Sequence, residues 1–220
     1  GHLPLLVGGT GLYIKAVVEN YPLDKLPYDA SCRAELNRLW DERGKDYMVR
    51  WLEAVDPEAA ARSKDRRRII RALEVYRLTG MSQTEIHRRG KVESPYDAVI
   101  FALTLPRTRL YQRIDARAAD MVAHGLLEEY MGLLEKGYSP ESKAMQGLGY
   151  YHAGMHVSGR WSREEMLANL QRDTRRYAKR QLSWFRGMEA VIWVDNSNPP
   201  ASIERISEFA AGKVQQYSEV

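Results

Sequence analysis

A glycine turn near the start of the chain has the residue types of an anion-binding site. Residues 5–7 are Leu, Leu and Val, and the run continues through Gly8, Gly9 and Thr10 into a helical pattern that includes Lys15. The apolar run favours a buried parallel strand. Glycines let a ligand approach the backbone, Thr10 is placed to cap the helix, and the first helical amides carry the positive end of its dipole. The turn predicts a phosphate or diphosphate cradle, and a plain packing corner is the alternative.

A strongly basic helix is predicted over residues 162–186, where Ser162 and Glu165 have the spacing of a capping box. With about 100° per residue, cations fall on one side and apolar groups on the other. The two sets are Arg172, Arg176, Lys179 and Arg186, and Leu170, Tyr177, Trp184 and Phe185. Residues 172–186 hold six cations against Asp173 alone, whereas a solvated helix with its own ion pairs would mix the signs. The imbalance favours a polyanion as partner.

A second basic cluster lies within residues 62–71, where Asp65 is the single acid. Its cations are Arg62, Lys64, Arg66, Arg67, Arg68 and Arg71. Two basic regions, one of them beside Trp and Tyr, predict a nucleic acid held between a core and an insertion. RNA is favoured over DNA because no DNA-reading motif is present and single-stranded RNA bases are commonly bound in pockets.

A pair of arginines, Arg113 and Arg117, is spaced to share one helical face. If that face is turned toward the glycine turn, an arginine there would neutralise a departing diphosphate. The alternative is a surface helix in which Asp115 pairs with a neighbour. His152 and His156 are also four residues apart, but the third ligand of a metal site is lacking, so they are interpreted as structural or surface residues.

Composition limits the class of protein. The chain has 220 residues, 33 Lys and Arg against 29 Asp and Glu, and one cysteine, Cys32. A single cysteine excludes an internal disulfide, which favours a reducing compartment. Membrane spans need about 18 consecutive apolar residues, and neither such a run nor a signal peptide is visible. We therefore expect a cytoplasmic protein that does not enter the membrane.

The periodicity predicts an α/β protein with a helical insertion. Residues 29–90 have a helical pattern throughout and predict a bundle of four or five short helices, whereas residues 97–105 and 191–194 read as strands. The expected core comprises residues 1–25 and 97–220, and the expected insertion comprises residues 26–96. Because a parallel strand at residue 3 needs neighbours, we expect the chain to be the C-terminal part of a longer protein.

Five blocks of the sequence together resemble the bacterial tRNA dimethylallyltransferases. They are Leu5-Leu-Val-Gly-Gly-Thr-Gly-Leu-Tyr13, Arg71-Ala-Leu-Glu-Val-Tyr76, Arg113-Ile-Asp-Ala-Arg117, Met145-Gln-Gly-Leu-Gly-Tyr150 and Tyr177-Ala-Lys-Arg-Gln-Leu-Ser-Trp-Phe-Arg186. The resemblance implies an incomplete P-loop nucleotide-kinase-like parallel-sheet core with an all-α insertion that binds tRNA. It also implies transfer of a dimethylallyl group from its diphosphate to N6 of the adenosine 3′ to the tRNA anticodon.

The resemblance assigns roles to individual residues. Thr10 and Arg117 would be catalytic. The diphosphate would be held by Gly8, Gly9, Thr10, Lys15, Arg113 and Arg117. The anticodon stem-loop of tRNA would contact Thr10, Arg33, Arg67, Arg68, Ile69, Ile70, Arg71, Gln146, Gly147, Leu148, Gly149, Tyr150, Arg175, Arg176, Lys179, Arg180 and Gln181.

The resemblance is incomplete at the start of the chain. The family's P-loop and its aspartate base would precede Gly1, and the ligands of the Mg²⁺ that accompanies the diphosphate are expected in the same segment. We therefore expect this polypeptide by itself, a monomer, to be inactive or nearly so. Two alternatives stay open, namely a prenyltransferase that acts on free adenine nucleotides and a non-catalytic RNA-binding helical module.

Overall fold

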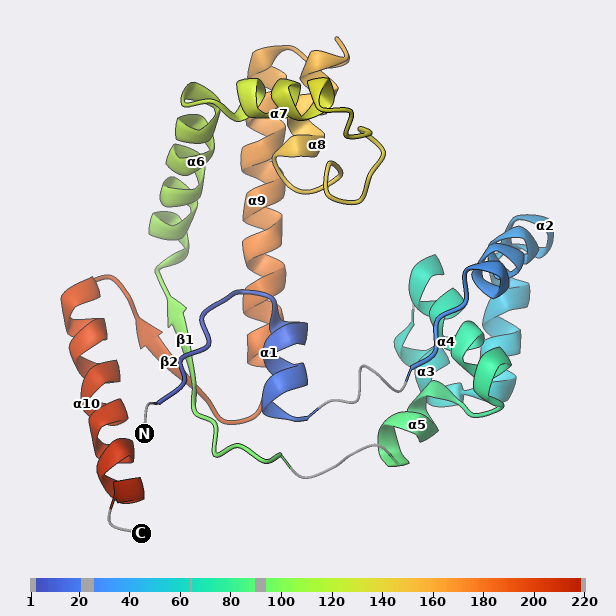
Figure 1. Ribbon diagram of the computed structural model, residues 1–220, viewed down its shortest axis with the longest axis horizontal. Coiled ribbons are helices and arrows are strands. Elements are labelled where there is room, and N and C mark those ends of the chain that lie inside the picture. The colour runs from blue at the N-terminus through green and yellow to red at the C-terminus, as the bar shows by residue number, and fades with distance from the viewer. Residues whose placement is uncertain (1–2, 21–25, 64, 90–93, 219–220) are drawn as a thin grey trace. The chain divides into compact units, whose positions relative to one another are not determined.

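The computed structural model describes residues 3–20, 26–63, 65–89 and 94–218 (Figure 1). The chain divides into two compact units. The α/β unit comprises Gly1–Gly9 and Val99–Val220, and the helical unit comprises Thr10–Ala98. The first helix therefore belongs to the helical unit, whereas the sequence-based division assigns it to the core.

The helical unit contains five helices within the described residues. They are α1 (Gly11–Val18), α2 (Ala30–Val55), α3 (Pro57–Arg62), α4 (Arg66–Thr79) and α5 (Gln83–Arg89). Gly44 interrupts α2 with a φ of 78° and a ψ of 173°, a conformation that favours glycine. The bundle predicted for residues 29–90 is thereby confirmed, with Gly44 separating two helical segments. Its core is formed by α2 and α4, with Leu36, Met48 and Leu52 facing Ile69 and Leu73.

Short polar side chains set the helix starts in this unit. The carboxylate of Asp29 accepts from the Cys32 amide, that of Asp56 from the Ala59 amide and that of Asp65 from the Arg68 amide. Each bond satisfies an amide that the first helical turn leaves without a partner. The Asp56 carboxylate also accepts from the Thr84 amide of α5 at 2.9 Å, so α3 and α5 are both bonded to the same aspartate.

The α/β unit is built on two parallel strands, β1 (Ile100–Thr104) and β2 (Val191–Asp195). Ile100 lies opposite Val191, and the register continues to Thr104 opposite Asp195. The helices of this unit are α6 (Arg107–Ala123), α7 (Leu126–Glu135), α8 (Tyr150–Val157), α9 (Arg163–Arg186) and α10 (Pro199–Ser218). The expected α/β class with a parallel sheet is confirmed.

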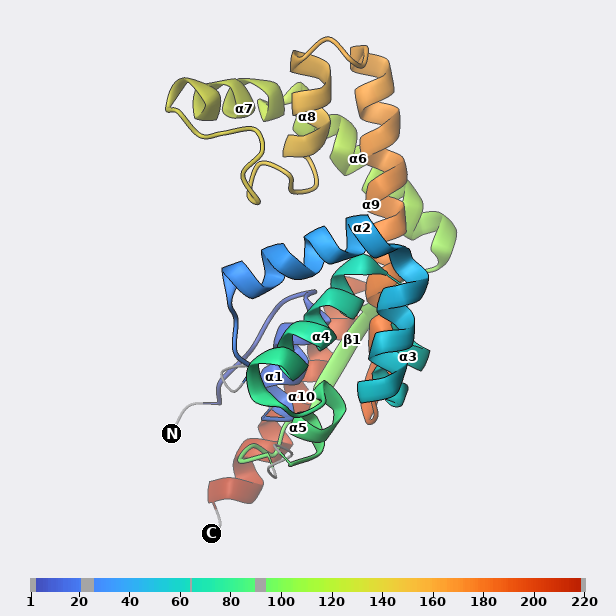
Figure 2. The same cartoon turned by 90° about the vertical axis from the view of Figure 1, so that its right-hand side faces the viewer.

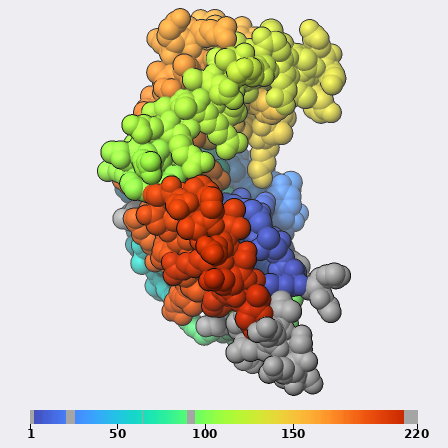
Figure 3. Space-filling model, turned by 90° about the vertical axis from the view of Figure 1, so that its left-hand side faces the viewer, coloured from blue at the N-terminus to red at the C-terminus, as the bar shows by residue number. Residues whose placement is uncertain are grey.

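A second core forms where α6, α7, α8 and α9 meet (Figure 2). Its buried residues include Val122, Tyr130, Ala153, Met166 and Leu170. On the other side of this unit, Phe209 of α10 makes an edge-to-face contact with Phe101 of β1, with ring centroids 5.3 Å apart. Figure 3 shows α10 in red beside the green α6 on this face.

Two predictions of burial are wrong. Residues 5–7 do not form a strand, and Leu5 and Val7 are 80% and 83% exposed. In the described part of the chain the sheet consists of β1 and β2 alone, so residues 5–7 have no ladder to join. On α9, Leu170 is buried as expected, but Tyr177 and Trp184 are 40% and 41% exposed, because α8 packs beside only the first part of the helix (Figure 1).

Candidate diphosphate and nucleic-acid site

The glycine turn is attached to the basic helix α9. The side-chain amide of Gln181 donates a 3.0 Å hydrogen bond to the carbonyl oxygen of Gly9. A Cβ on Gly9 would lie 2.2 Å from the same nitrogen, whereas a Cβ on Gly8 would meet nothing within 4 Å. Gly9 thus makes room for a protein side chain. Neither Gly8 nor Gly9 has a positive φ. The close approach of the Gln181 side chain, and not an unusual backbone conformation, therefore explains the glycine at position 9.

Thr10 occupies the N-cap position of α1 as predicted, but its hydroxyl makes no capping hydrogen bond. Its carbonyl oxygen accepts from the amides of Tyr13 and Ile14 instead. The exposed hydroxyl is therefore available to a ligand. Lys15, one turn later, forms an exposed ion pair with Glu19 at 3.4 Å, and pairs of this kind contribute little energy.

Arg113 and Arg117 of α6 are exposed, and neither forms an ion pair within the described residues. The acid between them, Asp115, is bonded to Arg175 of α9, and the Asp115 carbonyl accepts from Gln171 at 3.1 Å. Asp115 thus pairs with a neighbour, as the alternative interpretation held, but it leaves Arg113 and Arg117 uncompensated.

The turn and the arginine helix both contact α9. Gly9 meets it at Gln181 and Asp115 meets it at Arg175. Six residues of an α-helix correspond to about 9 Å along its axis. The glycine turn and α6 therefore approach neighbouring parts of one cationic helix in the α/β unit.

The cations of α9 fall into two groups. Arg172 and Arg176 bond to Asp173 at 3.0 and 3.2 Å. Hydrogen bonding from Arg172 lowers the pKa of Asp173, with a smaller contribution from His152, although burial acts in the opposite direction. In contrast, Lys179, Arg180 and Arg186 are exposed, and the described residues offer them no acid. The half of α9 that also carries Gln181 therefore keeps its positive charge.

Side-chain hydrogen bonds order the loop before α8 and tie the start of α8 to α7. The Gln146 amide donates to the Pro140 carbonyl at 2.8 Å, and the Tyr150 hydroxyl donates to Glu129 at 2.6 Å, which raises the pKa of Tyr150. Gly149 has a φ of 99°. Leu148 remains exposed at the surface, so this loop presents both polar and apolar groups to solvent.

Two arginines of the helical unit are bound to a buried acid, Glu74. The Glu74 side chain is fully buried and accepts from Arg33 at 2.5 Å and from Arg71 at 2.8 Å. Arg71 also donates to the carbonyls of Pro27 and Leu26. Burial raises the pKa of Glu74, but the bonds from Arg33, Arg71 and the Asp29 amide outweigh it, so the pKa is lowered overall. Both arginines therefore stabilise the fold, whatever they contact outside it.

The remaining members of the second basic cluster differ in their surroundings. Arg66 forms a two-pronged bond to Asp41, and Arg68 pairs with its cap Asp65. Arg67 is exposed and has no ion pair within the described chain, and Lys64 lies outside the described residues. Ile69 and Ile70 are 0% and 3% exposed. Both side chains pack in the core of the helical unit, and the contact of this segment with tRNA stays a prediction.

Sequence reasoning missed two features. Glu74 stands at a buried position of α4, and a carboxylate amid an apolar stripe is the signal that points to a paired acid. Two guanidinium groups lie near the Tyr111 ring, with that of Arg107 5.1 Å and that of Arg175 5.9 Å from the ring centroid. No sequence signal indicates the contact with Arg175, because that residue comes from a different helix.

The histidines belong to the fold, as interpreted from the sequence. His152 is 2% exposed, and its Nε2 lies 3.3 Å from Asp173.

Among the described residues, no group of three or more His, Cys, Asp or Glu side chains is arranged to hold a metal ion. Cys32 is a free, buried thiol. In the same part of the chain, no helix has both the length and the apolar character that crossing a membrane requires.

The fold and these surfaces define an α/β protein with a helical unit and a basic helix seated on a glycine turn. A model of the IPP transferase family matches residues 1–188. The tRNA dimethylallyltransferase of Heliobacterium modesticaldum is 45% identical over 196 residues, and that of Geobacillus kaustophilus is 42% identical over 220 residues. The chain belongs to the IPP transferase family.

A solved structure agrees with this assignment. The full-length tRNA isopentenylpyrophosphate transferase of Bacillus halodurans aligns with a TM-score of 0.63 at 37% identity, over 97% of this chain and 67% of that one. The matches with the Heliobacterium and Geobacillus proteins cover 88% and 98% of this chain. They span 61% and 70% of the length of those two relatives.

Proposed function

We propose that this chain serves the transfer of a dimethylallyl group from dimethylallyl diphosphate to N6 of the adenosine 3′ to the tRNA anticodon. The observation that carries the proposal is the bond from Gln181 to Gly9, which seats the glycine turn on the uncompensated half of α9. A turn that exposes a hydroxyl and helix amides suits a diphosphate. Cations beside it suit an RNA loop. The names of the relatives, tRNA dimethylallyltransferase, support the same reaction.

The chemistry assigns the residues as follows. When the bond between the allylic carbon and the diphosphate breaks, negative charge builds on the leaving group. Arg117 and Arg113 neutralise that charge, and the Thr10 hydroxyl and the amides after Gly9 donate hydrogen bonds to it. The N6 lone pair forms the new bond to carbon, and a general base takes the proton that N6 loses. Mg²⁺ would accompany the diphosphate and supply Lewis-acid chemistry. Among the described residues, no group of three or more His, Cys, Asp or Glu side chains is arranged to hold it.

The tRNA surface in this proposal is narrower than the sequence implied. On α9 it consists of Lys179 and Arg180, with Arg175, Arg176 and Gln181 as ordered neighbours. The loop from Gln146 to Tyr150 contributes exposed Gln146 and Leu148. In the helical unit Arg67 and Arg68 remain exposed. Arg33 and Arg71 are bonded to the buried Glu74, and their main role is to stabilise the helical unit. In this proposal the protein is a monomer and acts in the cytoplasm, where tRNA is found.

Transfer is tested with the complete gene product that contains this chain, labelled dimethylallyl diphosphate and two acceptors, tRNA and AMP. We expect label at N6 of one adenosine, and none in a transcript with guanosine 3′ to the anticodon. Label in AMP but not in tRNA would instead establish the free-nucleotide prenyltransferase.

The non-catalytic RNA-binding module is tested with Thr10→Ala. For the proposed enzyme this change should weaken diphosphate binding and leave tRNA binding in place, because the hydroxyl is exposed and caps nothing. A gene product that binds tRNA but neither binds the diphosphate nor transfers the label would be the binding module.

A further inference from the structure

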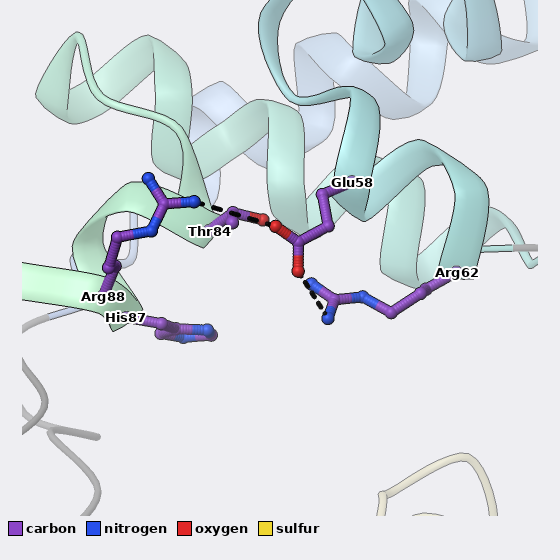
Figure 4. Close-up of a pocket in the computed structure, with 5 residues that line it drawn as sticks. All are labelled: Glu58, Arg62, Thr84, His87 and Arg88. Atoms are coloured by element: carbon purple, nitrogen blue, oxygen red, sulfur yellow. Dashed lines mark ion pairs between the residues drawn. The ribbon is translucent and has the colours of Figure 1, made fainter.

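The helical unit contains a polar pocket that the glycine turn and α9 do not use (Figure 4). Its volume is about 380 Å³, and α3 and α5 line it. Glu58 and Arg62 of α3 are four residues apart, as are Thr84 and Arg88 of α5, so each pair shares a helical face. His87 completes the lining. Two short helices thus turn their polar faces toward one space.

The ion pairs around this pocket do not balance in charge. Glu58 accepts from Arg62 at 2.9 Å and lies 3.8 Å from Arg88 (Figure 4). Arg88 also pairs with Glu85 at 2.7 Å, and Glu85 pairs with Arg89 at 2.7 Å. Three arginines thus face two glutamates, Glu58 and Glu85, which leaves a surplus of one positive charge around the pocket.

Burial lowers the pKa of His87, and the charge of Arg62 lowers it further, so His87 adds no charge at neutral pH. Arg62 and Arg88 have side chains 64% and 67% exposed. Exposed ion pairs of this kind contribute little and are readily exchanged for another anion.

Thr84 supplies the second observation. Its hydroxyl oxygen is buried and has no hydrogen-bond partner among the described residues. Buried polar atoms are normally satisfied, and an exception calls for an explanation such as a ligand. The Thr84 amide is bonded to Asp56 at 2.9 Å, and Asp56 also caps α3 through the Ala59 amide at 3.0 Å. One buried carboxylate therefore fixes both walls of the pocket.

We propose that this pocket binds a single phosphodiester group of an RNA backbone, held by Arg62, Arg88 and the Thr84 hydroxyl. The inference rests on the proposed function, because it supplies the helical unit with a defined contact to tRNA. A phosphodiester carries one negative charge and matches the surplus of one positive charge. Arginine guanidinium groups suit phosphate oxygens in geometry as well as in charge. Glu58 opposes the second charge of a free phosphate, which disfavours inorganic phosphate.

Binding of tRNA by the complete chain, measured against salt concentration, tests the arginines. Arg62→Gln should weaken binding about tenfold and reduce the slope of log affinity against log salt by about one, as expected for the loss of one phosphate contact. Arg38→Gln is the matched control. Arg38 is exposed and pairs with Glu42 four residues away, as Arg62 pairs with Glu58. Equal losses in the two variants would overturn the site, because net charge alone would then explain the effect.

Thr84→Val separates binding from folding. The change removes the hydroxyl and keeps the branched shape. We expect tRNA affinity to fall about fivefold while the thermal midpoint of unfolding stays unchanged or rises, because the hydroxyl has no partner in the described structure. A lower midpoint with unchanged affinity would assign Thr84 to the fold and overturn its role in binding.

Glu58→Gln identifies the group that is bound. Removal of the competing carboxylate should tighten tRNA binding, whereas weaker binding would show that Glu58 accepts from a nucleobase and would overturn the phosphodiester assignment. Inorganic phosphate at millimolar concentration should displace tRNA no better than chloride of equal ionic strength, and specific displacement would assign the site to free phosphate. If the wild-type chain binds tRNA and all variants match it, this inference alone fails. If the wild-type chain does not bind tRNA, the proposed function fails and the inference with it.

Discussion

The amide nitrogen of the Gln181 side chain lies 3.0 Å from the Gly9 carbonyl oxygen and occupies the space that a Cβ on Gly9 would need. Two residues 172 positions apart are thereby fixed against each other. The bond explains why glycine suits position 9 although its φ is ordinary. It also makes the position of the glycine turn depend on a side chain of α9.

Gly9→Ala should displace Gln181 and break this bond. Because Gln181 is the flexible end of a side chain, the steric cost is small, and the expected loss of stability is about 1 kcal/mol, the typical value of one hydrogen bond. Diphosphate affinity should fall as well, since Thr10 follows the turn directly. Chemical denaturation and titration with dimethylallyl diphosphate measure the two effects.

Gly8→Ala is the matched control for this prediction, because a Cβ there meets nothing within 4 Å. It should change stability by less than about 0.5 kcal/mol, as most surface substitutions do. In a background of Gln181→Ala, the cost of Gly9→Ala should largely disappear. Additive costs in the double variant would contradict the coupling of Gly9 and Gln181.

Local signals in the sequence predicted the helices well. The capping box from Ser162 to Glu165 acts through neighbouring backbone, so it can be read without tertiary information. Burial of residues 5–7 and of Tyr177 depends on which element packs against them. That relationship lies outside the local pattern, and these predictions were wrong for this reason.

Arg117→Gln should reduce the rate of dimethylallyl transfer by about a hundredfold or more, the loss expected when one donor to a developing anion is removed. The fold should be unaffected, because Arg117 is exposed and the described residues give it no ion pair. Arg160→Gln removes an exposed arginine from the turn between α8 and α9 and should leave the rate unchanged. Single-turnover kinetics with tRNA measures the chemical step, and a rate equal to wild type for Arg117→Gln would remove this residue from the mechanism.

Glu74→Gln should destabilise the helical unit by about 2–4 kcal/mol. The change leaves Arg33 and Arg71 without the buried carboxylate that both bind, and breaking such a group is costly, although the partly exposed arginines can turn toward water. Denaturation in urea measures the loss. Glu35→Gln is the control, because the pair of Glu35 with Arg77 is exposed on the same unit, and it should cost less than about 1 kcal/mol.

The site shows the same limit of sequence reasoning as the fold. The family resemblance predicts that Arg33 and Arg71 contact tRNA, but residue type alone does not reveal that an acid 41 residues from Arg33 also binds them both. The pocket of Arg62, Thr84 and Arg88 was also missed, because its parts come from two helices that are joined by tertiary contacts of Asp56 and Glu58. What the sequence did reveal is that Gly9 and Gln181 belong to motifs of one family, and the structure joins them.

The buried His152 makes the stability of the α/β unit depend on pH. Burial lowers the pKa of His152, and Asp173 compensates only in part. The unfolded chain, with an ordinary pKa near 6.5, therefore binds the proton more readily than the folded protein does. The free energy of unfolding should be highest above pH 6.5. It should fall as the pH drops from 6.5 through the lower pKa that His152 has in the folded protein. Urea denaturation followed by the fluorescence of Trp161, whose ring centroid lies 5.9 Å from that of His152, measures the effect.

His152→Gln should flatten this dependence between pH 7 and pH 5, because the group that takes up the proton on unfolding is removed. The glutamine amide can still donate to Asp173, so the cation cluster of Arg172 and Arg176 should stay in place. His156→Gln, on the same helix, should leave the wild-type dependence unchanged. A slope that survives in His152→Gln would mean that other groups control the acid sensitivity of this unit, and the buried histidine would then be a packing residue only.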